Sequence, residues 1–323
     1  MAKESDELNE IYSLQGIPES VLKKLAEHYS SISMLAVTSP QELVKLNISL
    51  KMSKTVVTAA RNKIGISPIT ATELLERQSE RRHITTSSQK LDEILGGGIH
   101  TGSITEFSGA FSSGKTQVAF QLSVNTQMSE DFGGLDGSVY FIDTESTFSS
   151  KRVFEMAKYL EEEKKIPDAK QAMSNIYVSR AFNAQHQVEL VKKADKLIAE
   201  KNVKLLIIDS IASHFRAEFL GKEMLPKRQQ ILMAHAEMLQ KYADSHEIAI
   251  VVTNQVIGNV DAFFEGSSVE PALGLAWAHR PAHRILLRKS KGTARIARVF
   301  DSPELAEREA VFHITETGIM DGF

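Results

Sequence analysis

The sequence predicts an α/β protein: a mostly parallel sheet covered by helices on both faces, preceded by a small all-helical domain. Two observations support the sheet. From Gly102 onward, short apolar runs alternate with longer stretches of helical periodicity, and a glycine-rich phosphate-binding motif separates the first run from a helical pattern. A third observation supports the helical domain, because residues 8–65 show helical periodicity alone.

Length and composition limit the number of domains and the classes of protein to which the chain can belong. The 323 residues suggest about two domains, and 42% apolar with 24% charged residues exclude disordered and fibrous classes. The chain has no cysteine, which excludes disulfides, thiolate zinc sites and cysteine nucleophiles. No apolar run is long enough to cross a bilayer, and the acidic start does not resemble a signal peptide. We therefore expect a soluble, intracellular protein with no membrane partner.

Residues 1–65 are expected to form a compact helical domain. Val21, Leu22 and Leu25 are spaced for one helix face, and Pro40 is placed to open another helix. Residues 66–85 contain Pro68 and a charged run, so they are expected to be a linker with one exposed helix. The remaining residues, 86–323, form the predicted core domain.

The core domain is expected to contain at least seven strands. They are predicted at residues 103–108, 138–143, 176–179, 205–209, 248–253, 284–288 and 296–300. Helices separate most of these strands, which favours right-handed crossovers and parallel pairing. The last two strands lie close together in the chain, so the C-terminal part is expected to turn antiparallel.

The strongest motif is GAFSSGKT at residues 109–116, a full match to GxxxxGK[ST]. In such a loop, glycines let successive N–H groups face phosphates at a helix N-terminus. Lys115 then neutralises the β/γ oxygens, and the Thr116 hydroxyl holds Mg²⁺. The predicted nucleotide-binding residues here are Gly109, Ala110, Phe111, Ser112, Ser113, Gly114, Lys115, Thr116 and Gln117.

Polar residues end three further predicted strands. Asp209 follows four apolar residues and is expected to bind the magnesium, although an acid there also caps helices. Glu145 is placed to orient an attacking water, the alternative being an ordinary surface acid. Gln255 ends the next strand, where it either senses the γ-phosphate or simply begins a loop.

Taken in order, these segments resemble the RecA/RadA recombinases, and most closely the archaeal RadA and eukaryotic recombinase branch. The resemblance runs from about residue 8 to the C-terminus. The segments that carry it are 101–107 (TGSITEF), 109–116, 141–145 (FIDTE), 205–210 (LLIIDS) and 253–256 (TNQV). The segments specific to the branch are 83–98 (HITTSSQKLDEILGGG), 215–218 (FRAE) and 301–303 (DSP).

The resemblance implies a RecA-like ATPase core with a helix-hairpin-helix-like N-terminal domain. It implies an ATP- and Mg²⁺-using, DNA-dependent ATPase that assembles on single-stranded DNA, as a filament or a ring, and exchanges strands with duplex DNA. Glu145 corresponds to the catalytic carboxylate, Gln255 to the γ-phosphate sensor and Arg152 to an arginine stacked on adenine. Asp301 and Pro303 correspond to a segment that caps the nucleotide of the neighbouring subunit. An archaeal cytoplasm is the implied compartment, or a nucleus if the source is eukaryotic.

The resemblance also implies two loops that line DNA. Arg216, Lys222 and Arg228 are the cations expected near phosphates, whose neutralisation supplies most sequence-independent affinity. Val260 and Phe264, in the second loop, are the apolar positions expected to wedge between bases.

Several positions depart from the family pattern. Ala110 replaces a glutamate, Pro68 stands where a docking phenylalanine is usual, and Ala306 replaces a proline. Leu275 replaces a glycine of the second DNA loop, and residues 47–52 lack the hairpin glycine that would approach a phosphate. These departures favour an alternative, a recombinase paralogue that binds ATP and DNA as a mediator with little strand exchange. A third reading is a RecA-fold ATPase that acts on protein.

Two other features stay open at this stage. A run of seven basic residues without an acid lies between Pro271 and Phe300, and either faces phosphates or is a solvated sheet edge. Trp277 either stacks on a base or packs against the sheet. His235 and His283 have no ligand-type spacing with acids and are expected to be packing or surface residues.

Overall fold

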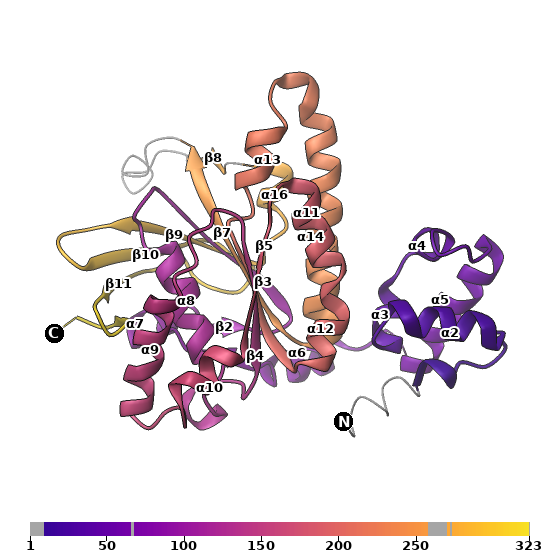
Figure 1. Ribbon diagram of the computed structural model, residues 1–323, viewed down its shortest axis with the longest axis horizontal. Coiled ribbons are helices and arrows are strands. Elements are labelled where there is room, and N and C mark those ends of the chain that lie inside the picture. Colours follow the sequence, from indigo (N-terminus) through magenta and orange to yellow (C-terminus); the bar gives the residue numbers. More distant parts are fainter. Residues whose placement is uncertain (1–9, 66–67, 258–269, 272, 323) are drawn as a thin grey trace.

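The computed structural model describes residues 10–65, 68–257, 270–271 and 273–322. A large twisted sheet forms the centre of the molecule, with helices packed on both of its faces (Figure 1). The predicted α/β class with a mostly parallel sheet is confirmed. Among the described residues, no helix combines the length and apolar character needed to span a bilayer.

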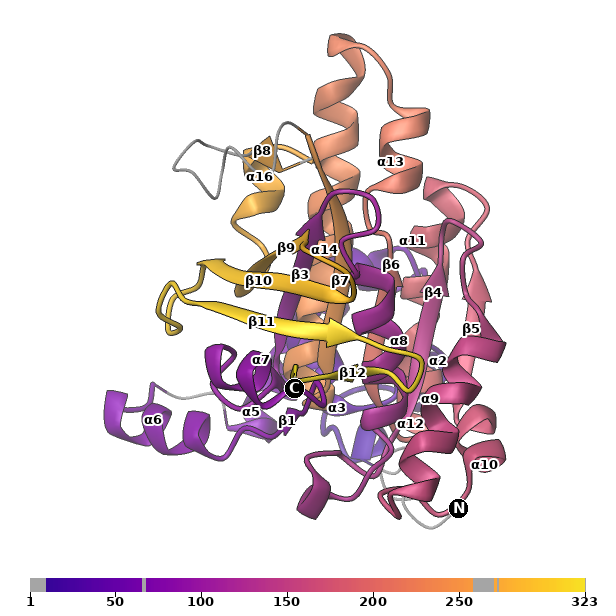
Figure 2. The ribbon, with the colours of Figure 1, turned by 90° about the vertical axis from the view of Figure 1, so that its left-hand side faces the viewer.

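The main sheet has the strand order β12-β11-β10-β9-β3-β7-β6-β4-β5, with β8 paired to β7. Its strands are β3 (Ser103–Gly109), β4 (Ser138–Asp143), β5 (Ile176–Arg180), β6 (Val203–Asp209), β7 (Ala249–Ile257), β8 (Glu270–Pro271), β9 (His283–Lys289), β10 (Ala294–Asp301), β11 (Glu309–Ile314) and β12 (Ile319–Met320). The six neighbouring strands β9, β3, β7, β6, β4 and β5 pair in parallel. Strands β9 to β12 pair antiparallel, as Figure 2 shows at the edge nearest the viewer. All seven predicted strands and the antiparallel turn of the C-terminal part are confirmed.

Two hydrophobic clusters cover the two faces of the sheet. Leu205 and Ile207 of β6 point to one cluster, and Leu206 and Ile208 point to the other, as the alternation of a strand requires. The first face packs on α7 (Gln89–Ile94), α8 (Lys115–Asn125), α9 (Ser150–Glu162) and α10 (Ala169–Ser174). The second packs on α11 (Ala184–Lys192), α12 (Ala194–Glu200), α13 (Ser213–Glu218), α14 (Leu225–His246) and α16 (Leu275–Ala278).

The N-terminal helices have a hydrophobic cluster of their own. They are α2 (Glu19–His28), α3 (Ile32–Val37), α4 (Pro40–Val44) and α5 (Leu50–Ile64). Pro40 is the first residue of α4, as predicted. Asn47 takes a left-handed backbone with φ +58°, which supplies the turn without a glycine. The separate cluster supports a helical domain at 1–65, and we propose 66–85 and 86–323 as the linker and the core domain.

Polar contacts join the helical N-terminal part to the core. The backbone N–H and the hydroxyl of Ser30 donate to the buried Asp195 of α12 at 2.8 and 2.7 Å. Lys241 of α14 forms an ion pair with Glu42 at 2.9 Å. The next helix, α6 (Ala71–Ser79), has no buried residue and leaves Leu75 65% exposed, as expected for an exposed linker helix.

A buried carboxylate organises the centre of the sheet. Glu106 of β3 is fully buried and accepts hydrogen bonds from Arg284 Nε at 2.7 Å, Trp277 Nε1 at 2.8 Å and Asn254 Nδ2 at 2.6 Å. Trp277 is therefore a packing residue, fully buried beside the sheet. Arg284 is buried in this ion pair, so it does not belong to a phosphate-facing basic stripe.

We predict that Glu106→Ala destabilises the core by about 3–5 kcal/mol. The substitution removes the buried carboxylate 2.7 Å from Arg284, so the guanidinium keeps only the half-exposed Asp301 at 3.5 Å. The urea midpoint of unfolding, followed by circular dichroism, measures the loss. Glu130→Ala, which breaks the exposed pair with Arg82, is the control and should change stability by less than about 1 kcal/mol. Equal effects of the two substitutions would contradict the role assigned to Glu106.

Candidate active site at the carboxyl edge of the sheet

The sheet register gathers the predicted site residues at one edge. Strands β3, β7, β6 and β4 are neighbours, and all four run in parallel. Gly109 lies opposite Gln255 across β3 and β7, and Asp143 lies opposite Asp209 across β4 and β6. The carboxyl ends of these strands therefore bring together residues that are far apart in sequence, at the edge where ligands of open α/β sheets bind.

The predicted phosphate loop runs from the end of β3 into the N-terminus of α8. Glycine is required at both ends of it. A Cβ on Gly109 would lie 2.4 Å from the carbonyl oxygen of Leu287, and Gly114 has φ +107° at the start of the helix. The predicted strand, loop and helix are confirmed, and the helix N-terminus supplies unpaired N–H groups suited to an anion.

Lys115 lies inside the curl of this loop. Its Nζ donates to the backbone carbonyls of Gly109 and Ala110, both at 2.9 Å. Burial lowers the pKa of Lys115, while the nearby Asp209 and Glu145 carboxylates oppose that shift. The ammonium is thus held in the loop by two neutral acceptors that phosphate oxygens would outcompete.

Asp209 connects the phosphate-loop helix to strand β7. Its Oδ2 accepts a hydrogen bond from Thr116 Oγ1 at 2.7 Å, and its Oδ1 accepts one from the Thr253 hydroxyl. Asp209 is 4% exposed, and burial raises its pKa. A hydroxyl and a carboxylate side by side are the hard oxygen donors that Mg²⁺ prefers, so Thr116 and Asp209 fit the predicted metal role. Thr253 was not singled out from the sequence, because its partner is 44 residues away.

Glu145 is positioned by the turn that follows β4. The Asp143 carboxylate accepts hydrogen bonds from the backbone N–H groups of Glu145 and Thr147 at 3.1 and 3.2 Å, which fixes the turn. Glu145 Oε1 then accepts from the Ser210 hydroxyl at 2.8 Å and from Gln255 Nε2 at 3.3 Å. The carboxylate faces the phosphate loop, where a group that orients water is needed.

Gln255 extends this network toward the predicted DNA-facing side. Its Oε1 accepts a hydrogen bond from Arg216 Nη1 at 3.0 Å, so Arg216, Gln255 and Glu145 form one chain. Lys222 lies in the 3₁₀ turn η2 (Lys222–Met224) and is exposed, and Arg228 is half-buried in the first turns of α14. This end of α14 projects beyond the sheet together with α13 (Figure 1). The predicted DNA contacts Val260 and Phe264 lie outside the described residues.

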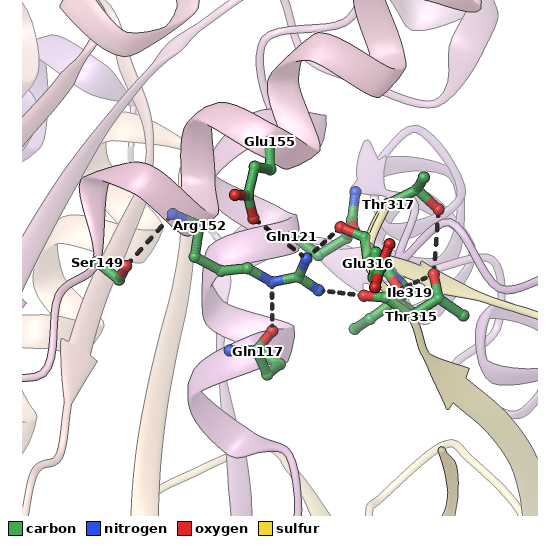
Figure 3. Close-up of polar contacts among 10 residues, drawn as sticks. Gln117, Gln121, Ser149, Arg152, Glu155, Thr315, Glu316, Thr317 and Ile319 are labelled. Atoms are coloured by element: carbon green, nitrogen blue, oxygen red, sulfur yellow. Dashed lines mark hydrogen bonds and ion pairs between the residues drawn. The ribbon is translucent and has the colours of Figure 1, made fainter. Parts of the chain in front are cut away.

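Arg152, predicted to stack on adenine, is tightly held beside the phosphate-loop helix (Figure 3). Its Nε donates to Gln117 Oε1 at 2.8 Å, and its Nη2 donates to the carbonyl of Thr315 at 2.5 Å. The carbonyl of Glu316 accepts from Nη1. Burial lowers the pKa of Arg152. The fixed guanidinium plane is suited to stacking.

A cavity of about 510 Å³ occupies this edge, within the size range of small-molecule sites. Besides residues 109–117 it is lined by Glu145, Asp209, Gln255 and Arg295. Arg295 was not predicted to bind nucleotide; its only sequence signal was its place in the basic run. Asp301 and Pro303 do not line the cavity, and Asp301 lies 3.5 Å from Arg284 of the same chain.

Comparison with known proteins assigns the chain to a family. The family model Rad51 matches residues 77–322. The chain belongs to the Rad51 family. It is 42% identical over 323 residues to the DNA repair and recombination protein RadA of Aeropyrum pernix, covering 99% of each chain. It is also 42% identical over 327 residues to the protein of the same name from Ignicoccus hospitalis, covering 99% of this chain and 98% of the relative. The resemblance inferred from the motifs is confirmed.

We predict that Lys115→Met weakens binding of Mg²⁺–nucleoside triphosphate by about 10- to 100-fold, since a hydrogen bond to a charged group contributes about 1.5–3 kcal/mol. Isothermal titration calorimetry measures the affinity. Lys151→Met, which removes an exposed lysine of the neighbouring helix α9, is the matched control and should leave the affinity unchanged. An unchanged affinity in Lys115→Met would remove this loop from the nucleotide site.

Proposed function

We propose that this chain is a DNA-dependent ATPase that assembles on single-stranded DNA and catalyses homologous pairing and strand exchange. One observation carries the proposal: the hydrogen-bonded chain from Glu145 through Gln255 to Arg216. It connects the proposed nucleotide cavity to the surface of α13. If Gln255 changes position when the γ-phosphate is bound or released, the position of Arg216 at the surface would therefore change as well.

The proposed division of roles follows the geometry. Lys115 and the helix N-terminus of α8 would hold the phosphates of ATP, and Thr116 with Asp209 would hold Mg²⁺, which would supply positive charge beside the phosphates. Glu145 orients the attacking water. Gln255 registers the γ-phosphate, and the guanidinium plane of Arg152 stacks on the base.

The DNA partners are single-stranded DNA and the duplex with which it is paired. Arg216, Lys222 and Arg228 supply positive charge for the phosphate backbone, a contact that is independent of sequence. Val260 and Phe264 are proposed to insert between bases. The relatives are named as DNA repair and recombination proteins, which supports DNA as the substrate. We accordingly place the protein in the cytoplasm with the nucleoid, or in the nucleus of a eukaryotic source.

Assembly with further copies of the chain is proposed from two exposed features. Helix α6 presents Leu74 and Leu75 to solvent, 45% and 65% exposed, on a helix without a buried residue. Exposed leucines on an isolated helix are suited to docking on another surface. The second feature is the segment that begins at Asp301, which is proposed to cap the nucleotide of the next subunit in a filament or ring.

The mediator alternative rests on a specific observation. Pro68, which stands where the family has a docking phenylalanine, is exposed beside Ile69 and offers a smaller apolar anchor. A paralogue with this linker would bind ATP and DNA but form few long assemblies. The third possibility, an ATPase acting on protein, is less favoured, because Arg216 lies at the end of the chain of hydrogen bonds.

We predict that single-stranded DNA stimulates ATP hydrolysis and that Glu145→Gln lowers the stimulated rate by about 100-fold or more, because the group that orients water is lost. Phosphate release measures the rate, and light scattering in the presence of ATP reports assembly. Glu163→Gln, which changes an exposed acid at the end of α9 that does not line the cavity, is the control and should behave as wild type.

Two outcomes would contradict this proposal. ATP binding with slow hydrolysis that does not respond to DNA, and scattering that does not rise, would favour the mediator. A Glu145→Gln variant as active as wild type would overturn the catalytic role of Glu145.

A further inference from the structure

A cluster of metal-binding side chains lies away from the nucleotide cavity. His100 of β2 (Ile99–His100), His283 at the start of β9 and Glu304 after β10 each offer one donor atom, and these three atoms lie within 4.8 Å of one another. None of the three lines the proposed nucleotide site. The sequence did not predict this cluster, because its members are up to about 200 residues apart.

The distances match the edges of a tetrahedral site. His100 Nδ1 lies 3.5 Å from Glu304 Oε1, and His283 Nε2 lies 3.3 Å from the same oxygen. Four ligands at about 2.0–2.1 Å from a zinc ion lie about 3.3 Å from one another. Two of the three edges therefore already have the required length, and Glu304, whose side chain is 42% exposed, has the freedom to adjust.

The second nitrogen of each imidazole already lies within hydrogen-bond distance of an oxygen atom. His100 Nε2 lies 2.9 Å from the carbonyl oxygen of Leu95, which can only accept, so Nε2 carries the proton and Nδ1 keeps its lone pair. His283 Nδ1 lies 3.1 Å from the hydroxyl of Ser302. Metal-bound histidines have this pattern, in which an oxygen beyond the site fixes the ring orientation.

His283 supplies an independent sign of a missing partner. Its side chain is 3% exposed, yet its Nε2 has no hydrogen-bond partner, although the Glu304 oxygen is 3.3 Å away. A buried polar atom without a partner is costly, and few native structures tolerate one without a bound water or ion. His283 Nε2 faces the space shared with His100 and Glu304.

We propose that His100, His283 and Glu304 bind a Zn²⁺-class transition-metal ion, with water as the fourth ligand. Two neutral imidazoles and one carboxylate suit Zn²⁺, whereas Mg²⁺ and Ca²⁺ prefer all-oxygen sites. The ion fastens the segment that follows Asp301 to the end of β2 and the start of β9. If that segment caps the nucleotide of the next subunit, as proposed above, the ion also stabilises the capping conformation. The metal site itself does not depend on the proposed ATPase function.

Cobalt binding tests the proposal directly. Tag-free, full-length protein, stripped with a chelator and free of nucleotide, is titrated with Co²⁺, and the visible d–d absorption is recorded. Tetrahedral Co²⁺ absorbs far more strongly than the octahedral ion that an all-oxygen site would hold. The chain has no cysteine, so no thiolate site competes. Displacement of the Co²⁺ signal by Zn²⁺ then gives the zinc affinity.

The expected result is one equivalent of tetrahedral Co²⁺ per chain, displaced by Zn²⁺. Glu304→Gln and His100→Gln should each weaken binding by at least about 10- to 100-fold, the loss caused by removing even an outer partner of a metal site. Glu307→Gln, an acid of the same segment that pairs with Arg298, is the matched control and should bind as wild type does. Circular dichroism verifies that each variant is folded.

Absence of a tetrahedral Co²⁺ signal in the wild type would overturn the proposal. Equal binding by wild type and Glu304→Gln would overturn it as well. Neither result would bear on ATP hydrolysis, so failure of the metal site and failure of the proposed function are distinguishable.

Discussion

The candidate active site depends on the hydrogen bonds that one buried carboxylate, that of Asp209, accepts. It is almost fully buried at the end of β6, where it accepts hydrogen bonds from Thr116 of α8 and Thr253 of β7. A buried charge is costly unless it is hydrogen-bonded or paired. Two hydroxyls and the ammonium of Lys115 offset part of that cost, and a bound divalent cation would offset more. The helix of the phosphate loop is thereby fixed to the two central strands before any nucleotide binds.

From this buried centre the polar network runs outward to exposed groups. Glu145 and Gln255 are exposed, and Arg216 lies at the far end of the chain of hydrogen bonds. Hydrogen bonds at exposed positions contribute about 0.5–1.5 kcal/mol each, so they can be exchanged at low cost. We propose that this rigid buried anchor, followed by weak and exchangeable bonds, transmits the state of a phosphate without unfolding the sheet. The segment after Asp301 and the exposed leucines of α6 would connect the same centre to other copies of the chain.

The features that could be predicted from the sequence are formed by residues close together in the chain. The phosphate loop was found because strand, glycine pattern and helix start are contiguous, and Asp209 and Glu145 each end an apolar run. Contacts between distant segments could not be predicted. Arg284 was counted in a basic run because nothing nearby reveals its pairing with Glu106, 178 residues away. Arg295 and the group of His100, His283 and Glu304 were missed for the same reason: only the sheet pairing brings them to their partners.

The central claim is that Gln255 joins the nucleotide cavity to the DNA-facing surface. The most direct test measures the affinity of a non-hydrolysable ATP analogue with and without saturating single-stranded DNA, in wild type, Gln255→Ala and the control Gln240→Ala of α14. Linkage predicts that DNA raises the wild-type and control affinity by about 5- to 150-fold. Gln255→Ala should still bind both ligands but lose most of that increase. An increase of the same size in Gln255→Ala would contradict the account.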